Sequence, residues 1–193
     1  MSTAAALPRR LMLALVALVA AVALLPAATA GASGTATYGG TTLALDSGAA
    51  GALTSLGVTP GVVGPATAGA SGLRFPIVNS FGNALATRSI RHSGGISLTK
   101  GATVVKLTDF NINLGFRPDL TAKLGAARAS ILDLDFRGSR IGFADGGIRI
   151  GPVKATLTQG AADALNGAFG VTAFTKGLLL GKATVNYSLF PRY

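Results

Sequence analysis

The sequence predicts an all-β domain, a sandwich or a barrel-like sheet, that carries two short helices and follows an N-terminal signal peptide. Through residues 41–193, short segments alternate apolar and polar residues, which is the pattern of strands with one buried face. Glycine, proline and Asp-Gly turn signals separate these segments. Apolar residues at helical spacing are confined to 47–56 and 159–169. We therefore expect a single β-rich domain over 41–193.

Residues Met1–Ala30 have the composition of a secretory signal. Arg9-Arg10 form a positive n-region, Leu11–Leu25 is an apolar run, and Ala28–Ala30 is a small-x-small cleavage box. The run is shorter than the roughly 20 apolar residues that a spanning helix needs, and an uncleaved anchor is the alternative. We expect a secreted mature chain without a transmembrane segment, either released or held at the cell envelope.

The mature chain is strongly basic and has no cysteine. Removing Arg9 and Arg10 from the 17 basic residues leaves 15 against 7 acidic ones, a net charge of +8. This balance suits an anionic partner such as a cell-wall polymer, a membrane surface or a carboxylate ligand, and a solvated outer face is the alternative. Nucleic acid is not favoured, because no nucleic-acid motif is present and few aromatic residues lie among the basic ones.

The mature chain begins with a Gly-, Ser- and Thr-rich segment, 31–40, which we expect to be flexible. Thr41–Leu45 reads as a short strand. Asp46 can then cap a helix over 47–56, and Gly57 follows where a C-terminal glycine belongs.

Further along, proline and glycine content predicts a loop over 59–72. Leu73–Ile77 alternates, and its Pro76 places that strand at a sheet edge. The phase of the alternation changes near Thr108–Asp109, which indicates a bulge or a break. Later strands are expected over 120–124, 132–136, 141–150 (a hairpin around Asp145-Gly146), 153–157 and 183–189.

One strand–helix unit occurs twice, over 41–59 and 153–172. The sequence GAAGAL in the first unit corresponds to GAADAL in the second, and each unit then reads Gly-Val-Thr. Asp46 and Thr158 occupy the same capping position. The repetition predicts two similar corners of one sheet.

The stretch Ile90–Leu98 holds the only histidine of the chain. His92 shares the parity of the apolar residues, so we expect a single strand that buries His92 on its inner face. A bulge at Gly94-Gly95 would instead turn His92 outward, and both readings stay open.

His92 and Tyr187 are the candidate ligand-binding pair, because both lie on the apolar parity of expected strands. Imidazole nitrogen and phenolate oxygen are axial haem ligands in proteins without a ligating cysteine. Arg88 or Arg91 would meet the haem propionates. The alternative is that both His92 and Tyr187 are core residues, each with a satisfied hydrogen bond.

Catalytic and metal signals are weak. Asp133 and Asp135 could share a calcium ion, but no glycine-punctuated calcium loop surrounds them, and salt-bridged surface aspartates are the alternative. With one histidine, no cysteine and no nucleophile-elbow motif, the sequence offers no catalytic set, so we expect a non-enzyme without a metal site.

The stretch Ile90–Leu98, with the β-rich segment after it, resembles the HtaA-type domain of secreted or surface-attached actinobacterial proteins, several of which bind haem. The family motif is an aliphatic strand that runs into His-x-Gly-x-Leu, and here His92 lies one position earlier relative to Gly95. The family's Trp-Gly opening and Tyr-Ile motif are absent. The resemblance implies a haem-type ligand and carries over only His92.

Two functions follow. The first is a secreted, non-enzymatic binding module for haem or another apolar anionic ligand. The second is a structural or adhesive envelope protein that contacts anionic wall polymers and has no small-molecule site.

Overall fold

The computed structural model describes residues 35–144 and 146–193, so the expected signal peptide lies outside the described residues. Within them the chain forms three helices, α1 (Ser47–Ser55), α2 (Phe81–Thr87) and α3 (Gln159–Phe169). It also forms twelve strands: β1 (Thr37–Leu45), β2 (Thr59–Val63), β3 (Thr67–Gly69), β4 (Gly72–Pro76), β5 (Ser89–Arg91), β6 (Gly95–Lys100), β7 (Thr103–Asn113), β8 (Asp119–Leu124), β9 (Ala127–Asp135), β10 (Arg140–Ala144), β11 (Gly147–Leu157) and β12 (Leu179–Arg192).

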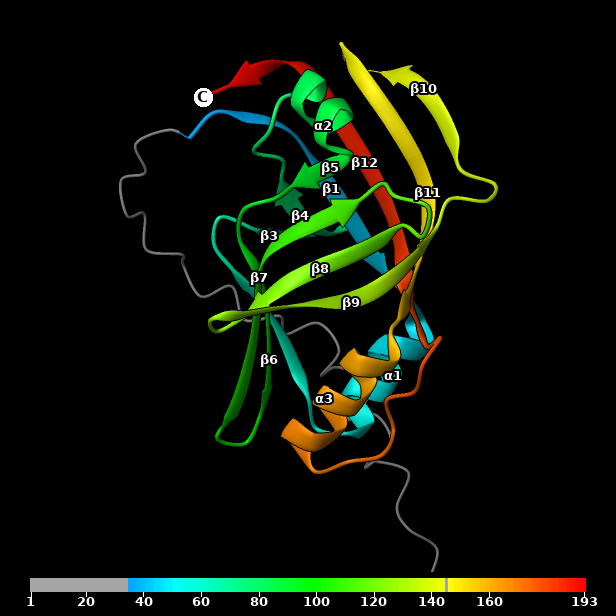
Figure 1. The fold of residues 1–193 in the computed structure, drawn as a ribbon. Coiled ribbons are helices and arrows are strands. Elements are labelled where there is room, and N and C mark those ends of the chain that lie inside the picture. Colours follow the sequence, from blue (N-terminus) through cyan, green and yellow to red (C-terminus); the bar gives the residue numbers. More distant parts are fainter. Residues whose placement is uncertain (1–34, 145) are drawn as a thin grey trace, which may run out of the picture. The chain divides into compact units, whose positions relative to one another are not determined.

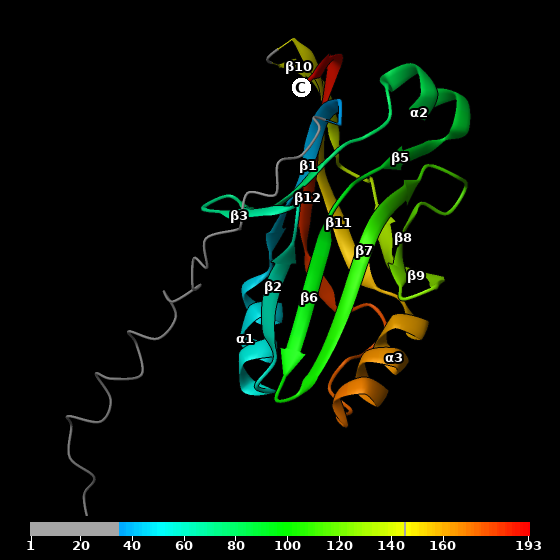
Figure 2. The same ribbon diagram turned by 90° about the vertical axis from the view of Figure 1, so that its left-hand side faces the viewer.

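The strands form one antiparallel, nearly closed barrel-like sheet in the order β2-β6-β7-β8-β9-β11-β12-β1-β4-β3, with β10 attached to β11 and β5 to β7. Its two ends, β2 and β3, lie near each other without pairing as strands. We call this gap in the ladder the seam. Helices α1 and α3 lie at one end of the sheet and α2 lies at the other (Figures 1 and 2).

The core lies in the space that the sheet encloses. Alternate residues of β7, β9, β11 and β12 point inward, and Leu157, Val153 and Val185 are among the most deeply buried side chains. The rings of Phe75 and Phe110 pack edge to face, with centroids 5.0 Å apart. The predicted all-β class is therefore confirmed, with a barrel-like sheet.

The two predicted helices are present, and their caps are the predicted residues. Asp46 accepts a hydrogen bond from the Gly48 amide at the start of α1. Thr158 accepts one from the Ala161 amide at the start of α3. Both units thus turn from a strand into a helix through a capping side chain.

The prediction of only two helices is wrong, because α2 is a third. Ser80 caps it by accepting a hydrogen bond from the Asn83 amide, and Arg88 ends it in the left-handed conformation. The helix has seven residues and includes Gly82 and Asn83, which are weak helix formers. Such a short segment leaves no periodic signal in the sequence.

The predicted loop over 59–72 is also wrong, because β2 and β3 lie within it. Strand β2 pairs only with β6, and Pro60 is tolerated there because an edge strand needs no second ladder. The edge position predicted for Leu73–Ile77 is wrong for a related reason. Strand β4 lies between β1 and β3, and Pro76 stands beyond the last residue that pairs with β3.

The single strand expected through Ile90–Leu98 is broken at residues 92–94 into β5 and β6. His92 nevertheless stays buried, as predicted, and bridges to Ile77. The predicted irregularity near Thr108–Asp109 is confirmed, because the pairing of β7 with β8 shifts register there and Asp109 has a φ of 50°.

Strand β1 begins at Thr37, inside the segment 31–40 that was expected to be flexible. Thr37, Gly39 and Gly40 pair with β12, and the Tyr38 amide donates to the Ile77 carbonyl oxygen, so these residues are fixed in the sheet. The predicted hairpin is confirmed, since Ala144 of β10 pairs with Gly147 of β11. No helix within the described residues has the length and apolar content required to cross a membrane.

Candidate functional site

A cavity of about 100 Å³ lies inside the sheet and is lined by side chains from β1, β2, β4, β6–β9, β11 and β12 and from helices α1 and α3. Among the described residues that line it, Thr41 is the only one with a polar side chain. Inward residues from nearly the whole circumference meet there, including Phe75, Leu107 and Leu134. An apolar space of this kind holds no favourable place for water and favours an apolar guest.

Part of the apolar lining lies beside the seam, where Pro60 of β2 lines the cavity and is exposed. Leu43 and Leu73 are half-buried on the β1–β4 side, and Ile96 is half-buried on the β6 side. Leu45, at the end of β1, is 37% exposed. Since no ladder joins the two ends of the sheet, this is the place where the wall can part with the fewest broken hydrogen bonds.

His92 is 4% exposed and both of its ring nitrogens have partners. Nδ1 lies 3.3 Å from the Phe110 carbonyl oxygen, and Nε2 lies 2.7 Å from Thr41 Oγ1. Because a carbonyl can only accept, Nδ1 carries the proton and Nε2 accepts a hydrogen bond from the Thr41 hydroxyl. Burial lowers the pKa of His92 to about 4, so the ring is neutral at pH 7.

Tyr187 is also buried, at 2% exposure, and its hydroxyl donates to the backbone carbonyl oxygen of Asn79. Its ring packs edge to face against Phe81, with centroids 5.3 Å apart. Burial, reinforced by the neighbouring Tyr38, raises the pKa of Tyr187 to about 12, while Arg91 acts in the opposite direction.

Asn79 is the buried polar residue that organises this region, and no sequence pattern singled it out. Its Oδ1 accepts from the Arg91 amide at 2.9 Å, and its Nδ2 donates to the Ser89 carbonyl oxygen at 2.7 Å. Tyr187 and strand β5 are thereby joined through one residue, Asn79. Only its position between two strands, on the apolar side, would have hinted at burial.

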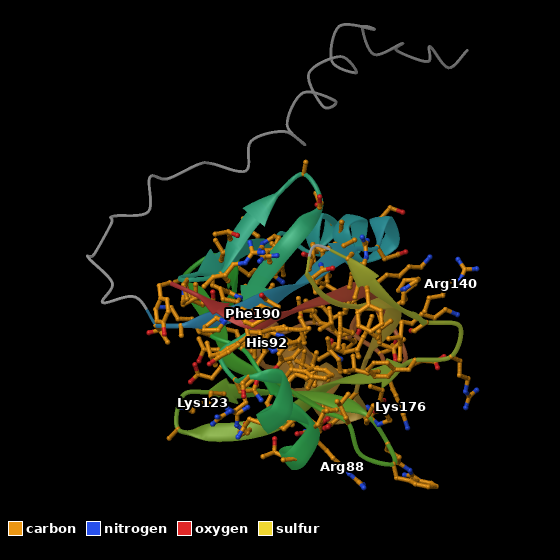
Figure 3. All side chains as sticks on the ribbon, turned by 90° about the horizontal axis from the view of Figure 1, so that it is seen from above. Arg88, His92, Lys123, Arg140, Lys176 and Phe190 are labelled. Carbon is orange, nitrogen blue, oxygen red and sulfur yellow. The ribbon has the colours of Figure 1, made fainter. Side chains whose placement is uncertain are left out.

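Of the four predicted ligand-binding residues, three gather around the segment 77–79. His92 bridges to Ile77, while Arg91 and Tyr187 both bond to Asn79. Arg88 stands apart at the end of α2, where its side chain is exposed and points away from His92 (Figure 3).

Neither His92 nor Tyr187 lines the interior cavity, but His92 contacts two residues that do. Thr41 and Phe110 lie between the histidine ring and the cavity in the hydrogen-bond network. No buried side-chain nitrogen or oxygen in the described part of the chain lacks a partner. The same part contains no group of three or more histidine, cysteine or acidic residues that could hold a metal ion.

No protein-family model and no curated protein matches this chain. Among solved structures, the chain is similar to the C-terminal domain of HtaA from Corynebacterium glutamicum, at 13% sequence identity and a TM-score of 0.48. The similarity covers 77% of this chain and 96% of that domain. The domain type is the one that Ile90–Leu98 resembles in sequence.

Proposed function

We propose that this chain is a secreted, non-enzymatic binding module that takes the apolar part of its ligand into the interior of the sheet. The observation that carries the proposal is the cavity whose lining is apolar except for Thr41 and includes Pro60 of β2, a strand at the seam. Burying apolar surface stabilises a complex by about 25 cal/mol per Å², and a dry cavity requires no polar group to be desolvated.

Intact-mass analysis of the exported protein tests secretion, since cleavage would remove Met1–Ala30.

The size of the cavity restricts the ligand. A cavity of about 150 Å³ holds benzene, whereas pockets for larger ligands measure roughly 300–1,000 Å³. At about 100 Å³, the space accommodates a small apolar group as it stands. A ligand with a longer hydrocarbon chain would extend toward the seam. An acidic group at the outer end of that ligand would remain in water, where the positive net charge of the protein favours an anion.

The direct test fills the cavity. Ala155 lines it and is 1% exposed, so Ala155→Leu, or the smaller Ala155→Val, places methyl groups into the ligand's space. Ala129→Leu adds the same volume to an exposed position of β9 and is the control. Calorimetric titration with straight-chain carboxylic acids of increasing length should give binding that Ala155→Leu abolishes and Ala129→Leu preserves.

Equal binding by the wild type and by both Ala155 variants, with all proteins folded by circular dichroism, would exclude the interior as the site. Failure of every acid to bind the wild type would reject the proposed ligand class. The Ala155→Val variant keeps the test interpretable if the leucine overfills the core.

Haem is the second candidate ligand, and the gathering of His92, Tyr187 and Arg91 around residues 77–79 favours it. A neutral imidazole is the form that ligates iron, and a guanidinium suits a propionate. In the present arrangement, the atoms that could ligate iron, His92 Nε2 and the Tyr187 hydroxyl oxygen, are both in hydrogen bonds. Haem iron would have to replace the hydrogen bond to Thr41 or the one to Asn79.

Titration with haemin separates this candidate from the first. Ligation by the pair predicts a sharpened Soret band that is lost in His92→Ala or Tyr187→Phe. A Soret change that both variants retain, and that an unrelated basic protein reproduces, would reject haem ligation by these residues.

A further inference from the structure

A second hollow, on the outer face of the sheet, has the opposite character to the interior cavity. It has a volume of about 320 Å³ and crosses three adjacent strands, β1, β12 and β11. Among the described residues, its polar lining is Thr42, Ser71, Arg149, Lys182, Thr184 and Asn186, and its one apolar lining residue is Ala44. We call it the outer groove.

The pairing of the strands explains why these side chains share one face. Thr42 and Ala44 alternate with Thr41 and Leu43, which point into the interior cavity. In the neighbouring strand, Thr184 pairs with Thr42, so its side chain lies on the same face of the sheet. The outer groove and the interior cavity therefore use opposite faces of the same strands and can be tested separately.

A third cation, Arg74, borders the groove. Gly40 of β1 has no side chain, so the Arg74 guanidinium can lie over it. Gly40 pairs with Asn186 of β12 and with Pro76 of β4. The guanidinium of Arg74 lies over Gly40, so close that a Cβ added at Gly40 would stand 2.9 Å from its Cζ atom. On the other side of β12, Asn186 pairs with Arg149 of β11. Asn186 therefore has Arg149 on one side and, on the other side, Gly40 with the Arg74 guanidinium over it.

Among the described residues, the cations of the groove have no acidic partner within ion-pair distance. The ion pairs found over residues 35–144 and 146–193 join Lys123 to Asp109 and Arg137 to Asp135, and neither pair involves the groove. Lys182 pairs across the ladder with Lys154, which adds a positive charge beside it. On its other side Lys154 pairs with Asp135 of β9, which is one strand further from the groove. Like charges directly opposite each other are destabilising, and a bound anion would remove that cost.

We propose that the outer groove binds a phosphate-bearing anionic polymer. Lys182 and Asn186 are four residues apart on one strand, which is about 13 Å and spans more than one small anion. Guanidinium groups bind phosphate through paired hydrogen bonds, and the hydroxyl groups and amide supply additional donors. A hollow with a single apolar lining residue suits a hydrated chain better than a bilayer, which rewards exposed apolar side chains.

Two charge-matched double variants test the site. Arg149→Gln/Lys182→Gln removes two cations from the groove, and Arg117→Gln/Lys176→Gln removes two exposed cations elsewhere. Binding of fluorescently labelled inorganic polyphosphate is measured by anisotropy at one fixed ionic strength. We expect the groove variant to lose about tenfold or more in affinity and the control variant to lose about twofold or less.

A third variant leaves the net charge unchanged. Gly40→Ala would push the Arg74 guanidinium aside, and Gly115→Ala, with nothing within 4 Å of the added carbon, is its control. We expect Gly40→Ala to weaken polyphosphate binding by about threefold, with an unchanged melting temperature.

Equal losses in the two double variants would show attraction by net charge alone and would overturn the proposal, as would unchanged binding in Gly40→Ala. Inorganic phosphate tests whether the groove requires a polymer. If it binds as tightly as polyphosphate, the groove recognises a single phosphate and the proposed polymer is refuted. Binding to vesicles of phosphatidylglycerol and phosphatidylcholine is measured last. If the groove variant loses binding to the vesicles but not to polyphosphate, the partner is a lipid surface and the proposed polymer is refuted.

Discussion

His92 is a buried histidine that is held neutral, so the stability of the protein should depend on acid. Its pKa in the folded protein is about 4, against 6.5 in an unfolded chain, because burial disfavours the charged ring. As the pH falls below about 6.5, the unfolded state takes up the proton first. The folded state therefore loses stability between pH 6.5 and pH 4.

The size of this loss is about 3 kcal/mol at pH 4, since each unit of pKa difference corresponds to roughly 1.4 kcal/mol. Urea unfolding of the wild type and His92→Gln between pH 7 and pH 4 would measure it. Glutamine keeps a neutral polar group near Thr41 but does not titrate, so the wild type should lose about 3 kcal/mol more than the variant. Parallel curves for the two proteins would show that the pKa of His92 is the same in the folded and unfolded states, so that burial does not lower it.

Leu134 and Asp135 are neighbours on β9 with opposite surroundings. Leu134 is 7% exposed and lines the cavity, whereas Asp135 is half-exposed and accepts a hydrogen bond from the Arg137 amide. Leu134→Asp buries an unpaired charge at a cost of several kcal/mol, comparable to the whole stability of a domain. Asp135→Asn keeps an acceptor oxygen and should change the stability by about 0.5 kcal/mol or less.

Thermal melts of these two variants provide the measurement. Leu134→Asp should unfold the protein or lower its melting temperature far below that of the wild type. Asp135→Asn should have the melting temperature of the wild type. Equal melting temperatures would mean that the inward and outward faces of β9 are reversed.

At the residue scale, burial was predictable wherever a residue belongs to a clear alternating run. The parity rule placed His92 and Tyr187 inside, and it holds even though the strand is broken at residues 92–94. The hydrogen-bond partners were not predictable, because Thr41 and Asn79 lie 51 and 108 residues from the side chains they bond. Local pattern carries no information about which distant strand supplies a partner.

At the scale of elements, the two predicted helices, α1 and α3, differ in how much each cap contributes. The Asp46 carboxylate accepts only from the Gly48 amide at the exposed start of α1. The Thr158 hydroxyl accepts from Ala161 and also donates to the Ser130 carbonyl oxygen of β9 at 2.9 Å. Thr158 therefore ties its helix to the sheet as well as capping it.

We expect Asp46→Ala to cost about 1 kcal/mol, the usual value for a lost cap. Thr158→Ala should cost about 2 kcal/mol, because a part-buried acceptor also loses its partner. Urea unfolding of both variants tests the difference. A cost for Asp46→Ala equal to or above that for Thr158→Ala would show that the bond to Ser130 adds nothing.

Elements were predictable when their sequence was long and regular, as in β12, or carried a cap, as in α1 and α3. The predictions failed at β2 and β3, where proline and glycine suggested a loop, and at α2, which is too short to show a period. Strands β2 and β3 end the path of the sheet, where one ladder suffices and local propensity is a poor guide.

At the scale of the whole molecule, the order of the strands was beyond the reach of the sequence. The chain places β12 between β1 and β11, so its last strand joins its first strand to the middle of the sheet. That arrangement creates both candidate sites, since the inner side of these strands faces the cavity and the outer side forms the outer groove. The alternating residues of β12 were visible in the sequence, but their neighbours were not.

The seam gives the last prediction, because a ligand that enters the cavity must part the wall where it is weakest. Strand β2 pairs on one side only, while β12 is held between β1 and β11. Amides of β2, such as those of Gly61 and Val63, should therefore exchange hydrogen faster than those of Ala183–Tyr187 in β12. A bound straight-chain acid that fills the space behind the seam should slow exchange in β2 and β6 more than in β12.

Hydrogen exchange followed by mass spectrometry, with and without the acid, measures both effects. Ala155→Leu is the control, since its filled cavity should leave the exchange of β2 unchanged when the acid is added. Protection that rises equally in all strands would indicate only global stabilisation by ligand binding. Exchange in β2 as slow as in β12 without ligand would show that the gap between β2 and β3 is closed in solution, and the ligand would then need another entrance.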